Sequence, residues 1–146
     1  MVVALNQNGT FQAPKSVLED FAFSRGWRVE KHPRFIADLT ANTAGDVVAF
    51  GNEGVLVAIN NGDGTFQARK KVIDNFGYDA GWRVEKFLRF PIDNGCADII
   101  GFGENGVFVS YSDGKGNLEP VHNLPSEFAY NGGEWSLEKR VGTAHG

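Results

Sequence analysis

The sequence predicts an all-β fold, a partial propeller of four-stranded antiparallel blades, and three observations predict it. The stretch 55–90 repeats much of 1–35, and a phenylalanine and a tryptophan lie 16 positions apart in both. A fainter third copy at 98–117 matches 46–65, which gives a period of 52 to 55 residues. Nineteen glycines separate short apolar runs that lack helical periodicity. Four short strands in a repeat of this length are typical of a propeller blade.

The first segment of each repeat is a β-branched run that ends in Phe-Gly, at 46–51 (DVVAFG) and 98–103 (DIIGFG). Its almost continuous hydrophobicity predicts a strand that is buried on both faces. The second segment follows a short Asn-Gly turn, at 55–60 and 107–112. It ends in a strong hairpin signal, which is NNGDG at 60–64 in the better copy.

The third and fourth segments are more polar. Residues 65–73 alternate between polar and apolar, and 82–90 (WRVEKFLRF) is predicted to be a strand with Trp82 and Val84 on one face. The glycine-aromatic stretch 75–81 (NFGYDAG) between them is predicted to be a loop.

The array divides into three units, an incomplete blade at 1–45, a second blade at 46–97 and a third at 98–146. The chain enters at a second segment, so the first blade lacks its first strand and the whole chain has eleven predicted strands. Propellers have four to eight blades, and open blades leave unpaired strand edges. We therefore expect a homo-oligomer, with a dimer favoured, or a place within a larger propeller.

Composition and charge exclude several classes of function. The net charge is −4, whereas proteins that bind polyanions usually carry an excess of positive charge. We therefore expect no nucleic-acid partner. Charged residues interrupt every apolar run before it reaches membrane-spanning length. Cys96 is the single cysteine, which leaves no intrachain disulfide. No secretory signal is visible, and the sequence leaves the localisation open between cytoplasmic and non-classically secreted.

Three stretches together, GWRVEKHPRF, DVVAFGNEGVLVAINNGDGTF and FGYDAGWRVEKF, resemble the repeats of the fungal Psathyrella velutina lectin family. The resemblance covers almost the whole chain and is most specific in the second repeat. It implies a propeller lectin that recognises N-acetylglucosamine-type glycans, sialylated ones included, in pockets between consecutive blades. The alternative is a structural or protein-binding module of the related integrin-like repeats, as part of a larger propeller.

Each repeat places one tryptophan directly after the glycine-aromatic loop. An indole ring can stack on the apolar face of a sugar, or it can pack between blades, and packing is the favoured interpretation. A loop aromatic precedes each tryptophan, and in the first two repeats an arginine follows it, as a donor to sugar hydroxyls or a partner of Glu30 or Glu85. His32 is expected to be exposed to solvent. The candidate ligand-binding residues are Phe23, Trp27, Arg28, Tyr78, Trp82, Arg83, Tyr130 and Trp135.

Metal binding and catalysis have little support in the sequence. A calcium loop needs closely spaced oxygen ligands, and the resembling family's loop would fall at 37–46, where alanines dilute it. The oxygen-rich stretch 60–64 is better explained as a hairpin turn. Calcium is therefore a weak expectation, and no other cofactor is expected. No catalytic motif is present, so the sequence predicts a binding protein and not an enzyme.

Overall fold

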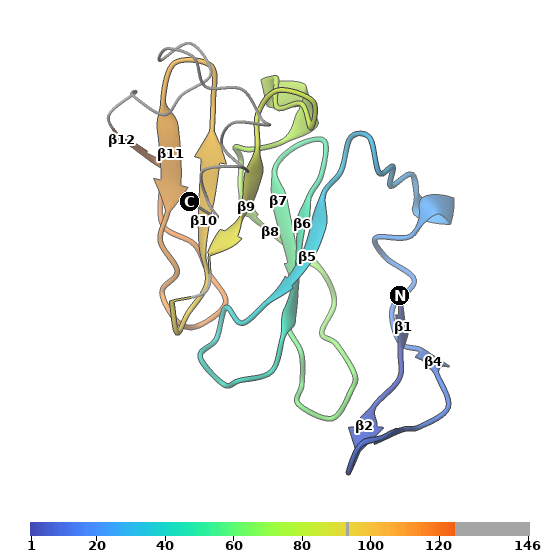
Figure 1. The fold of residues 1–146 in the computed structure, drawn as a ribbon. Coiled ribbons are helices and arrows are strands. Elements are labelled where there is room, and N and C mark those ends of the chain that lie inside the picture. The colour runs from blue at the N-terminus through green and yellow to red at the C-terminus, as the bar shows by residue number, and fades with distance from the viewer. Residues whose placement is uncertain (93, 125–146) are drawn as a thin grey trace.

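The computed structural model describes residues 1–92 and 94–124, and its all-β architecture confirms the predicted fold class (Figure 1). Two four-stranded antiparallel sheets lie side by side, and a smaller N-terminal part stands next to the first sheet. The helical elements in the described residues are two single-turn 3-10 helices, η1 (Phe23–Arg25) and η2 (Tyr78–Ala80). The arrangement is that of a partial, propeller-like array.

The first sheet has the strand order β5-β6-β7-β8. Its strands are β5 (Arg34–Ala37), β6 (Asp46–Phe50), β7 (Val55–Ala58) and β8 (Lys70–Ile73). All five residues of β6 are buried, as the apolar run at 46–50 predicts for a strand covered on both faces.

The second sheet has the strand order β12-β11-β10-β9 and repeats the first. Its strands are β9 (Arg89–Ile92), β10 (Asp98–Phe102), β11 (Val107–Ser110) and β12 (His122–Leu124). Val48 pairs with Val57 in the first sheet, and Ile100 pairs with Val109 in the second. Ile100 and Val109 each lie 52 positions after their counterparts in the first pair, so the strand register repeats with the sequence.

The N-terminal part is a fragment of a third such sheet. β1 (Val2–Val3) pairs with β4 (Lys15–Ser16), and β2 (Asn6–Gln7) pairs with β3 (Thr10–Phe11). In the repeat, β1 matches β7 and β4 matches β8. Strand β7 has a neighbour on each side, whereas β1 has a neighbour on one side only within the described residues.

The predicted strand at 82–90 is wrong for most of its length. Strand β9 begins only at Arg89, and the preceding residues form turns. The backbone N–H groups of Lys86 and Phe87 both donate to the Arg83 carbonyl oxygen, at 3.2 and 2.8 Å. The alternating pattern WRVEK therefore builds a compact turn, because local bonds satisfy the backbone that a strand would have paired across a sheet.

The sheets are offset from the sequence units. β5 pairs with β6 across the position where the units 1–45 and 46–97 were divided, so the end of each unit supplies the first strand of the next sheet. The division into units at 1–45, 46–97 and 98–146 remains a prediction about the sequence period.

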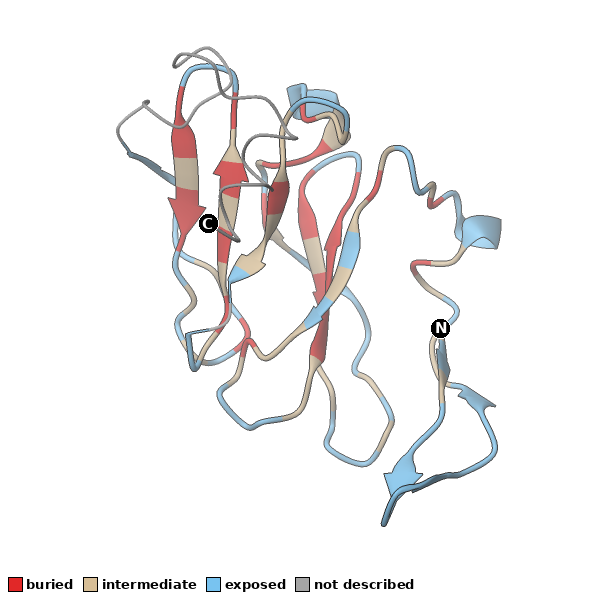
Figure 2. Cartoon of the chain, in the orientation of Figure 1, coloured by how far each residue is buried: buried red, intermediate tan, exposed pale blue. Residues whose placement is uncertain are grey.

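The main core joins the two sheets through a row of aromatic rings. Ring centroids lie 6.3 Å apart for Phe50 and Phe76, 5.1 Å for Phe76 and Trp82, and 5.9 Å for Trp82 and Phe108. Figure 2 shows that burial is concentrated in the middle strands of both sheets, while much of the N-terminal part is exposed. In the residues that the structure describes, no helix is long and apolar enough to cross a membrane.

Candidate functional site

The loop aromatics and the arginines form the same stacked pair in two repeats. The Arg83 guanidinium lies 3.6 Å from the centroid of the Tyr78 ring, and Arg28 lies 3.7 Å from that of Phe23. Nη1 of Arg83 donates to the carbonyl oxygens of Tyr78 and Trp82 at 2.6 and 3.0 Å, and Arg28 does the same one repeat earlier. The described residues contain no ion pair from these arginines to a glutamate. Each arginine therefore covers an aromatic face that a sugar would need for stacking.

The tryptophans lie beneath these pairs. Trp27 and Trp82 are 5% and 6% exposed, and Nε1 of Trp82 donates to Oδ1 of Asn75 at 3.2 Å. Trp82 sits in the core between the two sheets, whereas Trp27 packs against Phe21 and borders an open hollow. Tyr130 and Trp135, the candidates of the third repeat, lie outside the described residues.

A hollow of about 500 Å³ lies between the first repeat and the first sheet. One wall is the end of η1 and the loop that follows it. The other is formed by the turn between β6 and β7, the start of β8 and Asp79 of η2. Trp27 and Leu56 give it apolar surface, and its remaining lining is mostly polar. Its lining residues are Arg25, Gly26, Trp27, His32, Gly51, Asn52, Glu53, Leu56, Arg69, Lys71 and Asp79.

His32 is buried at this hollow, so the expectation that it is exposed is wrong. Its Nδ1 accepts a hydrogen bond from the backbone N–H of Arg28 at 3.0 Å, and its Nε2 lies 2.7 Å from Oδ1 of Asn52. The imidazole also contacts the Trp27 and Tyr78 rings edge-on, with centroid distances of 5.2 and 6.4 Å. His32 thus connects the first repeat to the turn of the first sheet.

The turn that carries Asn52 is fixed from the other side as well. The backbone N–H of Tyr78 donates to the Gly51 carbonyl at 3.0 Å, and that of Asp79 donates to the Asn52 carbonyl at 2.9 Å. Asn52 is therefore held by its backbone from the second glycine-aromatic loop and by its side chain from the first repeat. Its side chain is nevertheless exposed to the hollow.

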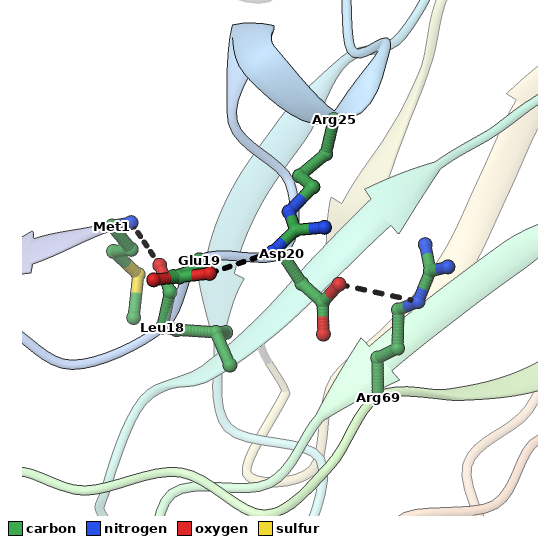
Figure 3. Close-up of polar contacts among 6 residues, drawn as sticks. All are labelled: Met1, Leu18, Glu19, Asp20, Arg25 and Arg69. Atoms are coloured by element: carbon green, nitrogen blue, oxygen red, sulfur yellow. Dashed lines mark hydrogen bonds and ion pairs between the residues drawn. The ribbon is translucent and has the colours of Figure 1, made fainter.

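Charged side chains line the hollow, among them Arg25, Arg69 and Lys71. Arg69 pairs with Asp20 at 3.5 Å, which ties the start of β8 to the N-terminal part, and Arg25 pairs with Glu19 at 2.6 Å (Figure 3). Lys71 lies 2.6 Å from Asp74 and 3.8 Å from Glu53. The hydrogen bond and charge of Asp74, followed by the charge of Glu53, raise the pKa of Lys71. The rim therefore offers both donors and acceptors to a polar ligand.

Sequence reasoning found Trp27 but missed the polar residues of this hollow, among them Asn52, Asp79 and His32. A usable signal was present for His32, because the matching position of the next repeat is Phe87, and Phe87 contacts Trp82 with a centroid distance of 6.0 Å. A position that takes phenylalanine in one repeat is expected to face the core in the other.

Geometry and sequence together describe a repeat-built, all-β protein with a mixed apolar and polar hollow between consecutive repeats. No family model matches the chain, and no curated protein matches it. Solved structures do match, and one is a lectin from Agrocybe aegerita described as specifically recognising non-reducing terminal N-acetylglucosamine. The two are 56% identical with a TM-score of 0.88, over 92% of this chain and 35% of that one. The chain is thus similar to a fungal lectin and spans about a third of its length.

Proposed function

We propose that this chain is a carbohydrate-binding lectin that takes terminal N-acetylglucosamine-type glycans into the hollow between its repeats. The 56% identity to the Agrocybe aegerita lectin over 92% of the chain is the observation that carries the proposal. The narrower resemblance of the repeats to the Psathyrella velutina lectin family supports the same ligand class, and sialylated glycans fall within that proposal. Both resemblances favour a binding protein and not an enzyme.

The hollow has the composition that a sugar requires. Trp27 and Leu56 can contact the apolar face or an acetamido methyl group, while Asn52 and Asp79 can bond to hydroxyl or carbonyl groups. The proposal includes no cofactor. Asp38, in the loop where the resembling family has a calcium loop, already accepts hydrogen bonds from the N–H groups of its own loop. Burial raises the pKa of the Asp38 carboxyl, but the hydrogen bonds that it accepts within its loop lower it. The net result is a pKa below the usual value.

Calorimetric titration tests the proposal. We expect N-acetylglucosamine to bind with a dissociation constant of about 0.1–10 mM, because few atoms of a monosaccharide are buried, and glucose to bind more weakly. Asn52→Ala should weaken binding about fivefold by removing one hydrogen bond. Asn61→Ala is the matched control, because Asn61 lies in an exposed hairpin turn outside the hollow. The absence of sugar binding by the wild-type protein would instead favour the structural, protein-binding module.

We also propose that the open edges are covered by further repeats, either in a second copy of this chain or in a larger propeller. Among the residues that the structure describes, β1 has no neighbour on the edge where the matching β7 pairs with β6. A hollow of about 400 Å³ with mainly apolar lining also lies between the N-terminal part and the first sheet, and its lining includes Ile36, which is 62% exposed. Exposed strand edges and apolar faces of this kind favour association.

Light scattering tests the first alternative. We expect the isolated chain at micromolar concentration to have the mass of an oligomer, with a dimer of about six blades favoured, because exchange between copies would cover both open faces. Ile36→Lys should shift the distribution toward the monomer, because it places a charge on the exposed apolar face. A soluble monomer that binds sugar would remove the dimer from the proposal.

A further inference from the structure

The orientation of the Asn52 amide follows from the protonation of His32. Because Nδ1 of His32 accepts a hydrogen bond from the Arg28 backbone N–H, the neutral ring carries its proton on Nε2. That proton is directed at Oδ1 of Asn52, 2.7 Å away. The amide therefore presents its oxygen to His32, and its Nδ2 group remains as a pair of donors.

These donors are available to a ligand. The structure gives Nδ2 of Asn52 no hydrogen-bond partner among the described residues, and the side chain is exposed where it lines the hollow. An amide N–H pair on the wall of a pocket selects for a good acceptor on the ligand. A carbonyl oxygen is such an acceptor, and an acetamido sugar carries one where glucose carries a hydroxyl group.

We infer that His32 is a positioning residue that fixes the Asn52 amide as a donor for the acetamido carbonyl of the ligand, and that acid weakens this site by protonating His32. The inference rests on the proposed function and adds the source of its selectivity. Protonation places a second N–H on Nδ1, where the Arg28 N–H already points, so two donors face each other and the ring must turn. Turning the ring releases Oδ1 of Asn52 and leaves the amide without a fixed direction.

The surroundings of the ring contain other charges, but histidine is the side chain that ordinarily changes charge between pH 5 and 8. On its own loop, Arg28 stacks on Phe23 and Lys31 lies 5.0 Å from the centroid of the Tyr78 ring. The charged groups that border the same hollow from the other elements are Arg25, Glu53, Arg69, Lys71 and Asp79.

The next repeat supplies the matched variant. Phe87 occupies the position of His32 and lies against Trp82, as His32 lies against Trp27. His32→Phe is therefore expected to fold, while it removes the donor to Asn52. His32→Gln keeps an N–H donor of similar reach and removes the titration.

The experiment measures N-acetylglucosamine and glucose binding calorimetrically at pH 7.5 and pH 5.5 for the three proteins, with melting curves as a check of folding. We expect wild type to lose about 3–10-fold in N-acetylglucosamine affinity at the lower pH, the value of one hydrogen bond. His32→Phe should show this weaker affinity at both pH values, with reduced preference over glucose. His32→Gln should keep the preference and lose the pH dependence.

The outcomes separate the two proposals. If wild type binds neither sugar, the proposed function is overturned and this inference falls with it. If wild type binds N-acetylglucosamine and a folded His32→Phe protein shows the same affinity, preference and pH profile, the inference alone is overturned. A pH dependence that persists in His32→Gln would assign it to another group and would also overturn the inference.

Discussion

Trp82→Ala is expected to lower the free energy of unfolding by about 3–5 kcal/mol, the usual cost of truncating a large buried aromatic side chain. Trp82 is 6% exposed, and its ring lies between Phe76 of its own loop and Phe108 of the second sheet. Removing the indole opens a cavity where the two sheets meet. It also leaves Oδ1 of Asn75 without the Nε1 donor.

Urea unfolding followed by circular dichroism measures this loss. Trp82→Phe should lower the free energy of unfolding less, because it keeps part of the ring contact with Phe76. Tyr78→Ala is the companion variant on the same loop, and we expect it to cost less than about 1 kcal/mol because Tyr78 is only half-buried. A cost below 1 kcal/mol for Trp82→Ala would show that the ring does not join the sheets.

The contrast between Trp27 and Trp82 shows why the sequence alone could not assign the tryptophans. Both occupy the same position in the repeat and are almost equally buried. Trp82 has a complete sheet on each side, while Trp27 faces the hollow beside the N-terminal fragment. The difference comes from which strands surround each ring, and these strands are distant in the sequence.

The features that could be predicted were those set by local pattern. The apolar runs at 46–50 and 98–102 are the middle strands. Burial on both faces is confirmed for the first, whereas in the second buried and partly buried residues alternate. The hairpin signal at 60–64 is a turn in which Asp63 accepts a hydrogen bond from the Thr65 N–H at 2.9 Å. The residue types within each short segment explain the strands and the turn, because β-branched runs favour strands and Asn, Asp and Gly favour turns.

The strand predicted for the WRVEK segment is wrong because its pattern fits both a strand and a turn. Alternation of apolar and polar residues is typical of a strand, but Gly26 and Gly81, which precede the two copies, have φ values of 90° and 96°. This left-handed conformation ends the 3-10 turn and redirects the chain, and the arginine that follows then bonds to carbonyl groups behind it. The hydrogen bonds of the turn, and not its side-chain pattern, decide the outcome.

The polar half of the hollow could not be predicted because it depends on a contact over 20 residues. His32 and Asn52 lie on different elements, and neither has a neighbour in the sequence that indicates a site. Comparison of the two repeats would have placed His32 in the interior, through Phe87, but not beside Asn52. Only the packing of the first repeat on the turn between β6 and β7 brings the imidazole and the amide together.

The second large effect is expected at Asp46, which begins β6. Its carboxylate is fully buried and accepts hydrogen bonds from the backbone N–H groups of Leu39 and Asn60, both at 2.8 Å. These bonds join the loop before β6 to the hairpin after β7. Asp98 repeats part of this arrangement in the second sheet, where it accepts from the Ser112 N–H at 2.8 Å.

Asp46→Ala should therefore cost about 2–5 kcal/mol, because two backbone donors lose their acceptor and the Leu39 N–H has no access to water. Asp46→Asn should cost less, since its single amide oxygen can still accept one of the two bonds. Asp63→Ala is the matched control, with an exposed carboxylate that serves only its own turn, and it should cost less than about 1 kcal/mol. The same urea titrations measure all three variants. Equal costs for Asp46→Ala and Asp63→Ala would mean that the buried carboxylate does not hold the two loops together.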